Sequence, residues 1–323
     1  MLARLSPLAA TFSPAPKLSV VVPLFNCLAL SKAMTGALRA TIPAGTTCEI
    51  ILVDDGSTDG TREWLATLGS PFRVVLNERN LGYGAANNRG ASLARGEYLA
   101  LLNNDLVLRP GWLEPMLEAH RSLGTDAGLI GNVQTDARSG AVDHAGIVFN
   151  HKGKAEHDRH PPSIWARSFR PVRKVPALTG ACVLMTTALW KSLGGFDEGY
   201  VNGCEDVDLC LRAAAAGRTN AVALRSVVGH HISSSPGRKS RDEENSHRLA
   251  VRWRPTLVRL GATAWCRNYL GGDPQTLPDQ ELARQCACYL AGLRKSPPSG
   301  ACAGVQAELE LELQRWQSEA GAR

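Results

Sequence analysis

Two short groups of acidic and amide side chains each follow an apolar run of the sequence. Asp54 and Asp55 end one run, and the Asn-Asn-Asp triplet at 103–105 ends another. Carboxylate and amide oxygens can hold a divalent cation or accept hydrogen bonds from a polar ligand. The same residue types form turns after strands, so either group alone favours a turn. Two such groups at equivalent positions favour a binding site.

A third acidic group stands at the start of a helical pattern. Glu205, Asp206 and Asp208 open a segment that continues through four alanines and stops at Gly217. Carboxylates suit the positive end of a helix dipole, which explains all three structurally. A catalytic explanation needs one of them to face a substrate as a general base. Glu205 and Asp208 are i, i+3 neighbours whereas Asp206 projects in another direction, so the spacing permits this role.

A pair of adjacent histidines, His230 and His231, follows a valine-rich run. Adjacent histidines are more often surface residues or satisfied core residues than metal ligands. A histidine at a strand end near carboxylates can nevertheless bind a divalent metal through a ring nitrogen. The pair therefore supplies a candidate metal ligand.

The first third of the chain contains the elements that must position these groups. Apolar runs at 18–22, 49–53, 73–76 and 98–102 predict buried strands, and helical patterns separate them. Strand–helix alternation with non-alternating strands predicts an α/β fold, with a mostly parallel sheet flanked by helices. Ligands of such sheets bind beyond the carboxyl ends of the strands. The two polar groups are therefore expected at one edge of one sheet.

Two helix starts can be predicted from capping and proline signals. Asn26 is expected to cap a helix that carries Leu30, Met34 and Leu38 on one face. Pro110 is expected in the first turn of a later helix.

The middle and the tail of the chain are more basic. Residues 151–174 hold seven Lys/Arg against two acids and are broken by prolines, which predicts a solvated basic loop or a cover over an anionic ligand. Three arginines surround Trp253 in the tail. They could cover the donor site or touch a membrane surface, and a plain helix face fits equally well. A stripe near the C-terminus favours a final helix that packs on the rest of the chain or on a second subunit, although the Glu/Leu alternation there also fits a strand. The three arginines are Arg248, Arg252 and Arg254, and the stripe consists of Val305, Leu309, Leu313 and Trp316, with Leu311 breaking it.

Composition limits the remaining possibilities. The 323 residues carry a net charge of +6, which favours phosphate-bearing partners without choosing among nucleotides, lipid headgroups and nucleic acid. A nucleic-acid-binding role has only this charge in its favour, so no nucleic-acid partner is expected. Nine dispersed cysteines form neither a disulfide framework nor paired zinc knuckles, and indicate reduced thiols in a cytoplasmic protein. No stretch is apolar enough to be a signal peptide or a membrane span.

Several other functional motifs are missing or incomplete. The G-x-x-x-x-G-K-[ST] phosphate loop and the G-x-S-x-G elbow do not occur. Residues 82–87 lack the third glycine of the dinucleotide fingerprint, and residues 54–60 have too few spaced oxygen ligands for a calcium loop.

Taken together, seven segments resemble family 2 glycosyltransferases with the GT-A nucleotide-sugar-binding fold. The resemblance is greatest to bacterial rhamnosyltransferase-like enzymes that build cell-surface polysaccharides. It covers roughly residues 18–235 in the family's order, and the segments are specific only as a set. They are LSVVVPLFN, EIILVDDGSTDGT, NLGYGAANNRG, ARGEYLALLNND, LTGACVLM, GGFDE and EDVDLCLR.

The resemblance implies roles for the acidic residues. Asp55 corresponds to the family's contact to the nucleotide base. The D-x-D metal motif is replaced by the amide-containing triplet, which leaves Asp105 as the main acidic metal contact. Asp206 corresponds to the general base, with Glu205 beside it, and His230 matches the metal-binding histidine better than its neighbour because an H-x-x-S-x-S pattern follows. The expected substrate-binding residues are Pro23, Phe25, Asp54, Asp55, Asn80, Gly82, Asn103, Asn104 and Gly180.

The function implied is inverting transfer of a sugar from a nucleotide-diphospho-sugar to an acceptor hydroxyl, with Mn²⁺ or Mg²⁺ as cofactor. The acceptor would be a glycan or lipid-linked glycan in surface polysaccharide or glycoconjugate synthesis. Two alternatives are a non-catalytic nucleotide-sugar-binding protein and a sugar nucleotidyltransferase. The residues Pro-Leu-Phe-Asn at 23–26 argue against the latter, because they replace its glycine- and arginine-rich loop.

The predicted organisation has three parts. Residues 1–16 form a flexible leader, residues 17–235 the GT-A catalytic domain, and residues 236–323 a mainly helical extension. The catalytic domain divides into a nucleotide-binding half, 17–107, and an acceptor half, 108–235. The expected location is the cytoplasm or the inner face of the membrane; peripheral membrane contact and a homodimer are both open.

Overall fold

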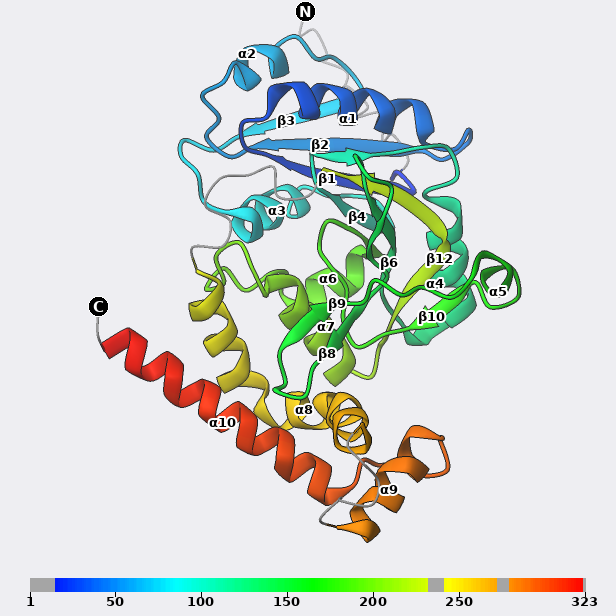
Figure 1. Cartoon of the computed structure of the whole chain (residues 1–323). Coiled ribbons are helices and arrows are strands. Elements are labelled where there is room, and N and C mark those ends of the chain that lie inside the picture. Colours follow the sequence, from blue (N-terminus) through cyan, green and yellow to red (C-terminus); the bar gives the residue numbers. More distant parts are fainter. Residues whose placement is uncertain (1–14, 232–240, 272–278, 322–323) are drawn as a thin grey trace, which may run out of the picture.

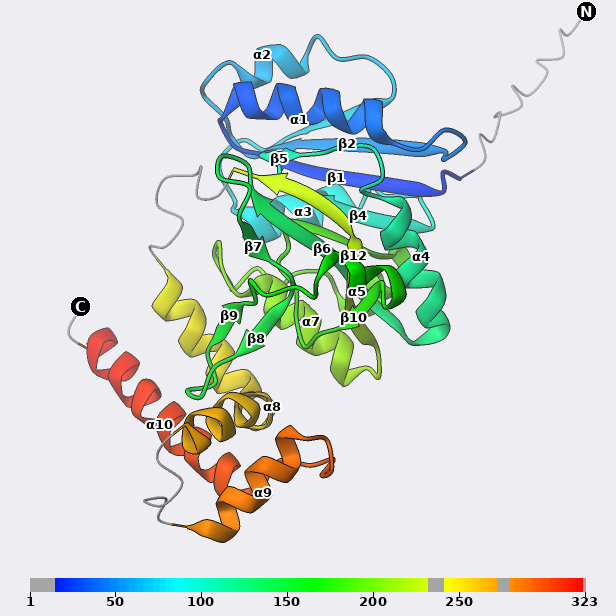
Figure 2. The same cartoon turned by 45° about the vertical axis from the view of Figure 1, so that its right-hand side comes forward.

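A twisted, mixed ten-stranded sheet lies between two layers of helices, and three C-terminal helices extend from one end (Figures 1 and 2). The computed structural model describes residues 15–231, 241–271 and 279–321. Most of the predicted leader lies outside this range, as do the serines that follow His230. Within it, no helix is both long and apolar enough to cross a membrane.

The N-terminal half of the sheet consists of four parallel strands in the order β3-β2-β1-β4. All four runs that were predicted as strands are confirmed, and β4 has the predicted bounds. The helices between them alternate as expected. The elements are β1 (Leu18–Leu24), α1 (Leu28–Thr41), β2 (Cys48–Asp54), α2 (Thr61–Leu65), β3 (Phe72–Leu76), α3 (Tyr83–Ala91) and β4 (Tyr98–Leu102).

The second half of the sheet is mixed. β11 (Cys182–Thr186) runs antiparallel between β4 and β6 (Ala127–Asp136), and β12 (Thr219–His230) pairs parallel with β6. Of the remaining strands, β5 and β10 pair antiparallel with β12, and β7 pairs antiparallel with β6. β8 and β9 form a separate antiparallel hairpin. They are β5 (Leu106–Val107), β7 (Val142–His144), β8 (Ile147–Phe149), β9 (Ala155–His157) and β10 (Val172–Lys174), and the helices here are α4 (Glu114–Leu123), α5 (Ile164–Phe169), α6 (Thr187–Leu193) and α7 (Glu205–Ala215).

Alternate residues of the central strands pack into two apolar layers. Val20 and Val22 of β1 face α1 and α4, whereas Val21 faces α3 on the other side of the sheet. Side chains of a strand alternate between its two faces, so a strand with apolar residues throughout is buried on both. This burial fixes the sheet edge at which the polar groups emerge.

The extension consists of α8 (Asp242–Leu270), α9 (Gln280–Leu290) and α10 (Ser299–Gly321). α10 packs along α8 (Figure 1). The predicted stripe of four residues is buried, while Leu311 is 62% exposed. The C-terminal helix and its apolar face are thus confirmed, and the surface that it covers belongs to the same chain.

Two predicted helix starts are wrong. The side chain of Asn26 caps no helix: its Oδ1 accepts from the Thr58 amide, while the amide of Leu28 donates to Asp59 across the next turn. Pro110 lies ahead of α4, which begins at Glu114 with a different proline in its first turn.

The basic segment at 151–174 was expected to be a loop, but it contains β9, α5 and β10. The prolines at 161, 162 and 171 lie between these elements, so they separate short elements and do not exclude them. β10 pairs with β12 and becomes an edge of the sheet.

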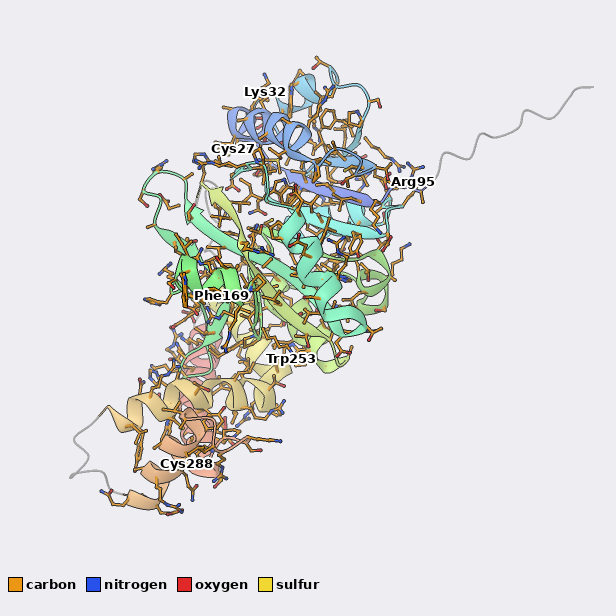
Figure 3. The ribbon with its side chains drawn as sticks, turned by 90° about the vertical axis from the view of Figure 1, so that its right-hand side faces the viewer. Cys27, Lys32, Arg95, Phe169, Trp253 and Cys288 are labelled. Atoms are coloured by element: carbon orange, nitrogen blue, oxygen red, sulfur yellow. The ribbon has the colours of Figure 1, made fainter. Side chains whose placement is uncertain are left out.

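The arginines around Trp253 form ion pairs within the chain. Arg248 and Arg252 bind Asp197, and Arg254 binds Glu310 of α10. Figure 3 places Trp253 at the junction between the extension and the sheet. Arg248 and Arg252 therefore attach the extension to the segment before α7, and Arg254 joins α8 to α10.

Candidate active site

A cleft of about 470 Å³ opens where β1, β2 and β4 end, beside the starts of α3 and α7. Eleven of the thirteen predicted site residues line it; Asp54 and His230 do not. Predicted residues from both halves of the catalytic domain meet here. They are Pro23, Phe25, Asp55, Asn80, Gly82, Asn103, Asn104, Asp105, Gly180, Glu205 and Asp206.

Asp55 is held in one orientation by three donors. Its carboxylate accepts from Asn77 Nδ2 at 2.6 Å and from the amides of Leu81 and Gly82 at 3.0 and 2.9 Å. The side chain is almost fully buried. The turn before α3 therefore fixes this carboxylate in the cleft wall, because charged acceptors form strong hydrogen bonds with amides.

Asp54 points away from the cleft and corrects one expectation. It is fully buried, binds Arg62 Nε at 2.7 Å and lies within 3.3 Å of the Ser57 amide. These contacts tie the end of β2 to α2. The expected substrate contact at this residue is therefore not supported by its geometry.

Asp105 and His230 are brought together by the pairing of β5 with β12, in which His230 lies opposite Leu106. His230 Nε2 lies 3.3 Å from Asp105 Oδ1, and the imidazole is only 4% exposed. The backbone amide of the next residue, His231, donates to the Asp105 carbonyl. Between the two histidines, the geometry thus favours His230 as the side chain beside the carboxylate.

This region has donor atoms that suit a divalent cation. Neither ring nitrogen of His230 nor Oδ1 of Asn103 has a hydrogen bond within the described residues, although all three atoms are buried. Carboxylate, amide and imidazole donors suit Mn²⁺ and, with more oxygen ligands, Mg²⁺. No group of three acidic, histidine or cysteine residues with metal-binding geometry is present in the described ranges. The residues fit a cation that takes its other ligands from a phosphate group or water.

Asp206 faces the cleft from the first turn of α7. Its Oδ2 accepts from the Gly180 amide at 2.7 Å, and its Oδ1 from the Val207 amide at 2.8 Å. Tyr83 donates to the Gly180 carbonyl at 2.8 Å. A Cβ at position 180 would lie 2.8 Å from the Tyr83 hydroxyl and 3.3 Å from the Asp206 Cβ, so a side chain here would displace Tyr83 and crowd Asp206.

Glu205, the neighbour of Asp206, closes a turn. It is 5% exposed and accepts from the Gly203 amide at 2.6 Å. The turn contains Asn202 and Cys204, both with positive φ. Glu205 thus shapes the cleft wall, while the carboxylate of Asp206 remains more accessible.

Several lining residues were missed from the sequence. Tyr83 and Asn202 come from distant segments, and the Tyr83 amide donates to Asn202 Oδ1 at 3.1 Å. His157 of β9 lines the cleft as well, so part of the basic segment does reach the site. The basic charge of that segment indicated a cover over an anionic ligand, but it did not identify which residue would line the cleft.

Comparison with known proteins identifies the family. Residues 19–169 match the family model described as Glycosyl transferase family 2. This match covers a family 2 domain within the chain and confirms the resemblance carried by the seven motifs.

Two bacterial relatives extend the likeness. O-antigen biosynthesis protein RfbC of Myxococcus xanthus is 30% identical over 295 residues, 88% of this chain and 22% of that protein. The N-acetylglucosaminyl-diphospho-decaprenol L-rhamnosyltransferase of Mycobacterium tuberculosis (strain H37Rv) is 28% identical over 232 residues, 65% of this chain and 74% of that protein. The chain thus spans only about a fifth of the length of RfbC.

Solved glycosyltransferase structures share the fold. GalNAc-T7 with UDP, GalNAc and Mn²⁺ matches with a TM-score of 0.59 at 18% identity, over 79% of this chain and 51% of that one. Mannosyltransferase PcManGT from Pyrobaculum calidifontis, with GDP-Man and Mn²⁺, matches with a TM-score of 0.53 at 18% identity, over 94% and 87%. The predicted GT-A fold with C-terminal helices is thus confirmed.

Proposed function

We propose that this protein transfers a sugar from a nucleotide-diphospho-sugar to an acceptor hydroxyl, with inversion at the anomeric carbon. The acceptor is a glycan or lipid-linked glycan used in surface polysaccharide or glycoconjugate synthesis. Family membership and the names of the bacterial relatives support the reaction class and the setting. The observation that carries the proposal is that Asp55, Asp105 and Asp206 line one cleft.

The donor nucleotide is assigned to the N-terminal half of the cleft. Asp55 is fixed there, and Phe25 lines the same region with 39% of its surface exposed. A carboxylate can accept from a nucleobase N–H, and an exposed ring can pack against a base or a sugar. Asn104 contributes differently, because its Nδ2 donates to Ser31 of α1 at 2.9 Å and so holds the triplet in place.

The diphosphate is assigned to the region of Asp105, His230 and Asn103. These residues would hold a Mn²⁺ or Mg²⁺ ion through a carboxylate oxygen, a ring nitrogen and an amide oxygen. When bound, such an ion offsets the negative charge that grows on the nucleoside diphosphate as it leaves. Because Asp105 is the one carboxylate among these three residues, oxygens of the donor diphosphate would supply further ligands to the ion.

Asp206 is the proposed general base. An acceptor hydroxyl is a weak nucleophile at neutral pH, so a carboxylate must take its proton as the oxygen attacks the anomeric carbon. The two amide donors on Asp206 orient its carboxylate toward the cleft. Attack from the side opposite the leaving nucleotide inverts the anomeric carbon in one displacement, and no glycosyl-enzyme intermediate is needed.

A donor panel tests this proposal. The full chain would be incubated with UDP-, GDP- and dTDP-sugars, with and without Mn²⁺ or Mg²⁺, and nucleotide release and product anomer would be measured. We expect metal-dependent release of one nucleoside diphosphate, stimulated by a glycan acceptor. Pyrophosphate formation from a nucleoside triphosphate and a sugar phosphate would instead indicate a nucleotidyltransferase. Tight donor binding without any turnover would indicate a binding protein.

A further inference from the structure

The edge of the sheet carries an exposed apolar helix that the proposed reaction does not use. Ile164, Trp165 and Phe169 of α5 are 79%, 74% and 70% exposed. They are three of the most exposed large apolar side chains in the described residues, and they lie within six positions of one another. Trp165 and Phe169 are in contact, with ring centroids 4.8 Å apart. A contiguous apolar patch of this kind marks an interaction surface.

Hydrogen bonds at both ends of α5 attach the patch to the rest of the chain. Ser163 caps the helix by accepting from the Ala166 amide. The Pro171 carbonyl accepts from the Leu224 amide at 2.8 Å, and β10 then pairs with β12. Figure 1 shows α5 projecting from this edge of the sheet, away from α10, and Figure 3 places Phe169 on the face that is turned to the viewer.

The charges around the patch favour an anionic partner. Residues 159–174 contain five Lys/Arg and no acidic residue. Asp143 and Asp158, the nearby acids, form ion pairs with Arg159 and Arg173. Arg170 and Lys174 are exposed and have no ion pair within the described residues. The helix therefore presents aromatic and aliphatic side chains beside uncompensated positive charge.

We propose that α5 and its flanking cations dock the protein on an anionic lipid bilayer, with Ile164, Trp165 and Phe169 entering the headgroup region. Tryptophan and phenylalanine favour this region, and each nearby Lys or Arg adds attraction to anionic lipid. A protein partner would also bury the aromatic rings, but only one with an acidic surface would match Arg170 and Lys174, whereas an anionic bilayer matches both the rings and the cations. The apolar side chains and the cations are both needed for stable docking, since a single weak anchor gives only reversible, marginal binding.

Vesicle sedimentation tests the docking surface. The full chain would be mixed with phosphatidylcholine vesicles, with or without about 30 mol% phosphatidylglycerol, an anionic fraction large enough to create a negative surface potential. We expect binding to the anionic vesicles only. The variant Trp165→Ala/Phe169→Ala should bind at least about tenfold more weakly, and Arg170→Gln/Lys174→Gln about fivefold more weakly per charge removed. High salt should weaken the wild type.

A matched control removes exposed apolar groups elsewhere. Val251→Ala/Leu311→Ala changes two side chains that are 61% and 62% exposed on α8 and α10, and it should bind vesicles like the wild type. Circular dichroism would confirm folding of every variant. The proposal is overturned if the wild type ignores anionic vesicles, or if the α5 variant binds them normally. Sedimentation velocity would show whether the chain forms a dimer. If the wild type dimerises, the α5 variant does not, and neither binds vesicles, the patch belongs to a contact with a second copy of the chain and the membrane proposal is overturned as well.

Discussion

Asp54 and Asp55 have different surroundings because their side chains leave the end of β2 in different directions. Asp54 is fully buried against Arg62, whereas Asp55 is bound by the turn before α3 and lines the cleft. The sequence alone cannot separate two adjacent aspartates, since the direction of each depends on partners that are distant in the chain. For the two histidines the following serine pattern already favoured His230, and its position beside Asp105 agrees with that choice.

The first prediction compares the two aspartates. Asp55→Asn should weaken donor binding at least about tenfold, because the amide cannot accept from all three donors and also lacks the charge. Asp54→Asn should lower the free energy of unfolding by about 1–3 kcal/mol while donor affinity stays close to normal, since it removes a buried ion pair outside the cleft. Calorimetric donor titration and urea denaturation measure the two effects. Equal loss of donor affinity in both variants would contradict the assignment.

The second prediction concerns the cation. His230→Gln and Asp105→Asn should each weaken Mn²⁺ binding in the presence of nucleoside diphosphate at least about tenfold, because each alters a proposed ligand. Electron paramagnetic resonance of free Mn²⁺ gives the affinity without relying on turnover. His231→Gln is the matched control and should bind Mn²⁺ normally. Loss of affinity in the control alone would reverse the choice between the histidines.

At the scale of elements, α7 is held between the cleft and the extension. Asp208 of α7 is fully buried and binds Arg212 Nε at 2.7 Å on its own helix. From α8, Trp253 Nε1 donates to Asp208 at 2.8 Å and Arg252 lies 3.2 Å from it. Trp253 has non-helical φ and ψ, and the resulting kink ahead of Pro255 directs its indole to α7. The extension thus helps to position the helix that carries Asp206.

The third prediction tests this positioning. Trp253→Phe should destabilise the fold by about 1–3 kcal/mol, since one hydrogen bond to a buried carboxylate is lost and the smaller phenyl ring fills less of the space of the indole. It should also lower kcat several-fold with little change in KM for the donor, because Asp206 shifts and the nucleotide site does not. Steady-state kinetics measure both constants, and Trp64→Phe on α2 is the control. A rise in KM alone would argue that Trp253 has no role in placing α7.

A second junction depends on charge. Burial alone would raise the pKa of Glu312 on α10, but hydrogen bonds from Lys154, Lys152 and Arg315 lower it to about 2 from its ordinary 4.5. A carboxylate whose pKa is depressed in the folded state adds stability above its unfolded pKa, and this is lost as the pH falls toward the folded pKa. The attachment of α10 to the turn between β8 and β9 should therefore weaken in acid.

The fourth prediction follows from that charge network. Glu312→Gln should cost about 1 kcal/mol of stability at neutral pH, since the site is near the surface. The difference from the wild type should shrink between about pH 4.5 and 2, because the wild-type carboxylate becomes protonated in that range. Urea denaturation at a series of pH values measures the difference. A difference that grows in acid would contradict the sign.

At the scale of the whole molecule, local patterns predicted the parallel half of the sheet well. Runs such as 50–53 and 98–102 are apolar throughout, and a strand buried on both faces has that pattern. The convergence of the polar groups at one edge followed from that topology. The antiparallel insertion of β11 and the β5–β12 pairing could not be predicted, because they depend on contacts between distant segments.

The extension shows the same division. The buried stripe of α10 could be predicted from its spacing, but the surface that it covers could not. The link from Trp253 to Asp208 needs a kink in α8, which no periodicity predicts. The short elements of the basic segment were hidden by prolines that separate them. Periodicity thus predicts elements and their faces, while the partners of those faces are set by the tertiary fold.

The most direct measurement compares Asp206→Asn with the wild type, using the donor selected by the panel. Acceptor-dependent transfer and donor affinity would be determined on the same preparations. With Asp206 as the base, transfer should fall about 10²–10⁴-fold while the donor dissociation constant changes little, because the amide preserves the shape but accepts no proton. A variant that transfers sugar at a near-normal rate would contradict the central claim.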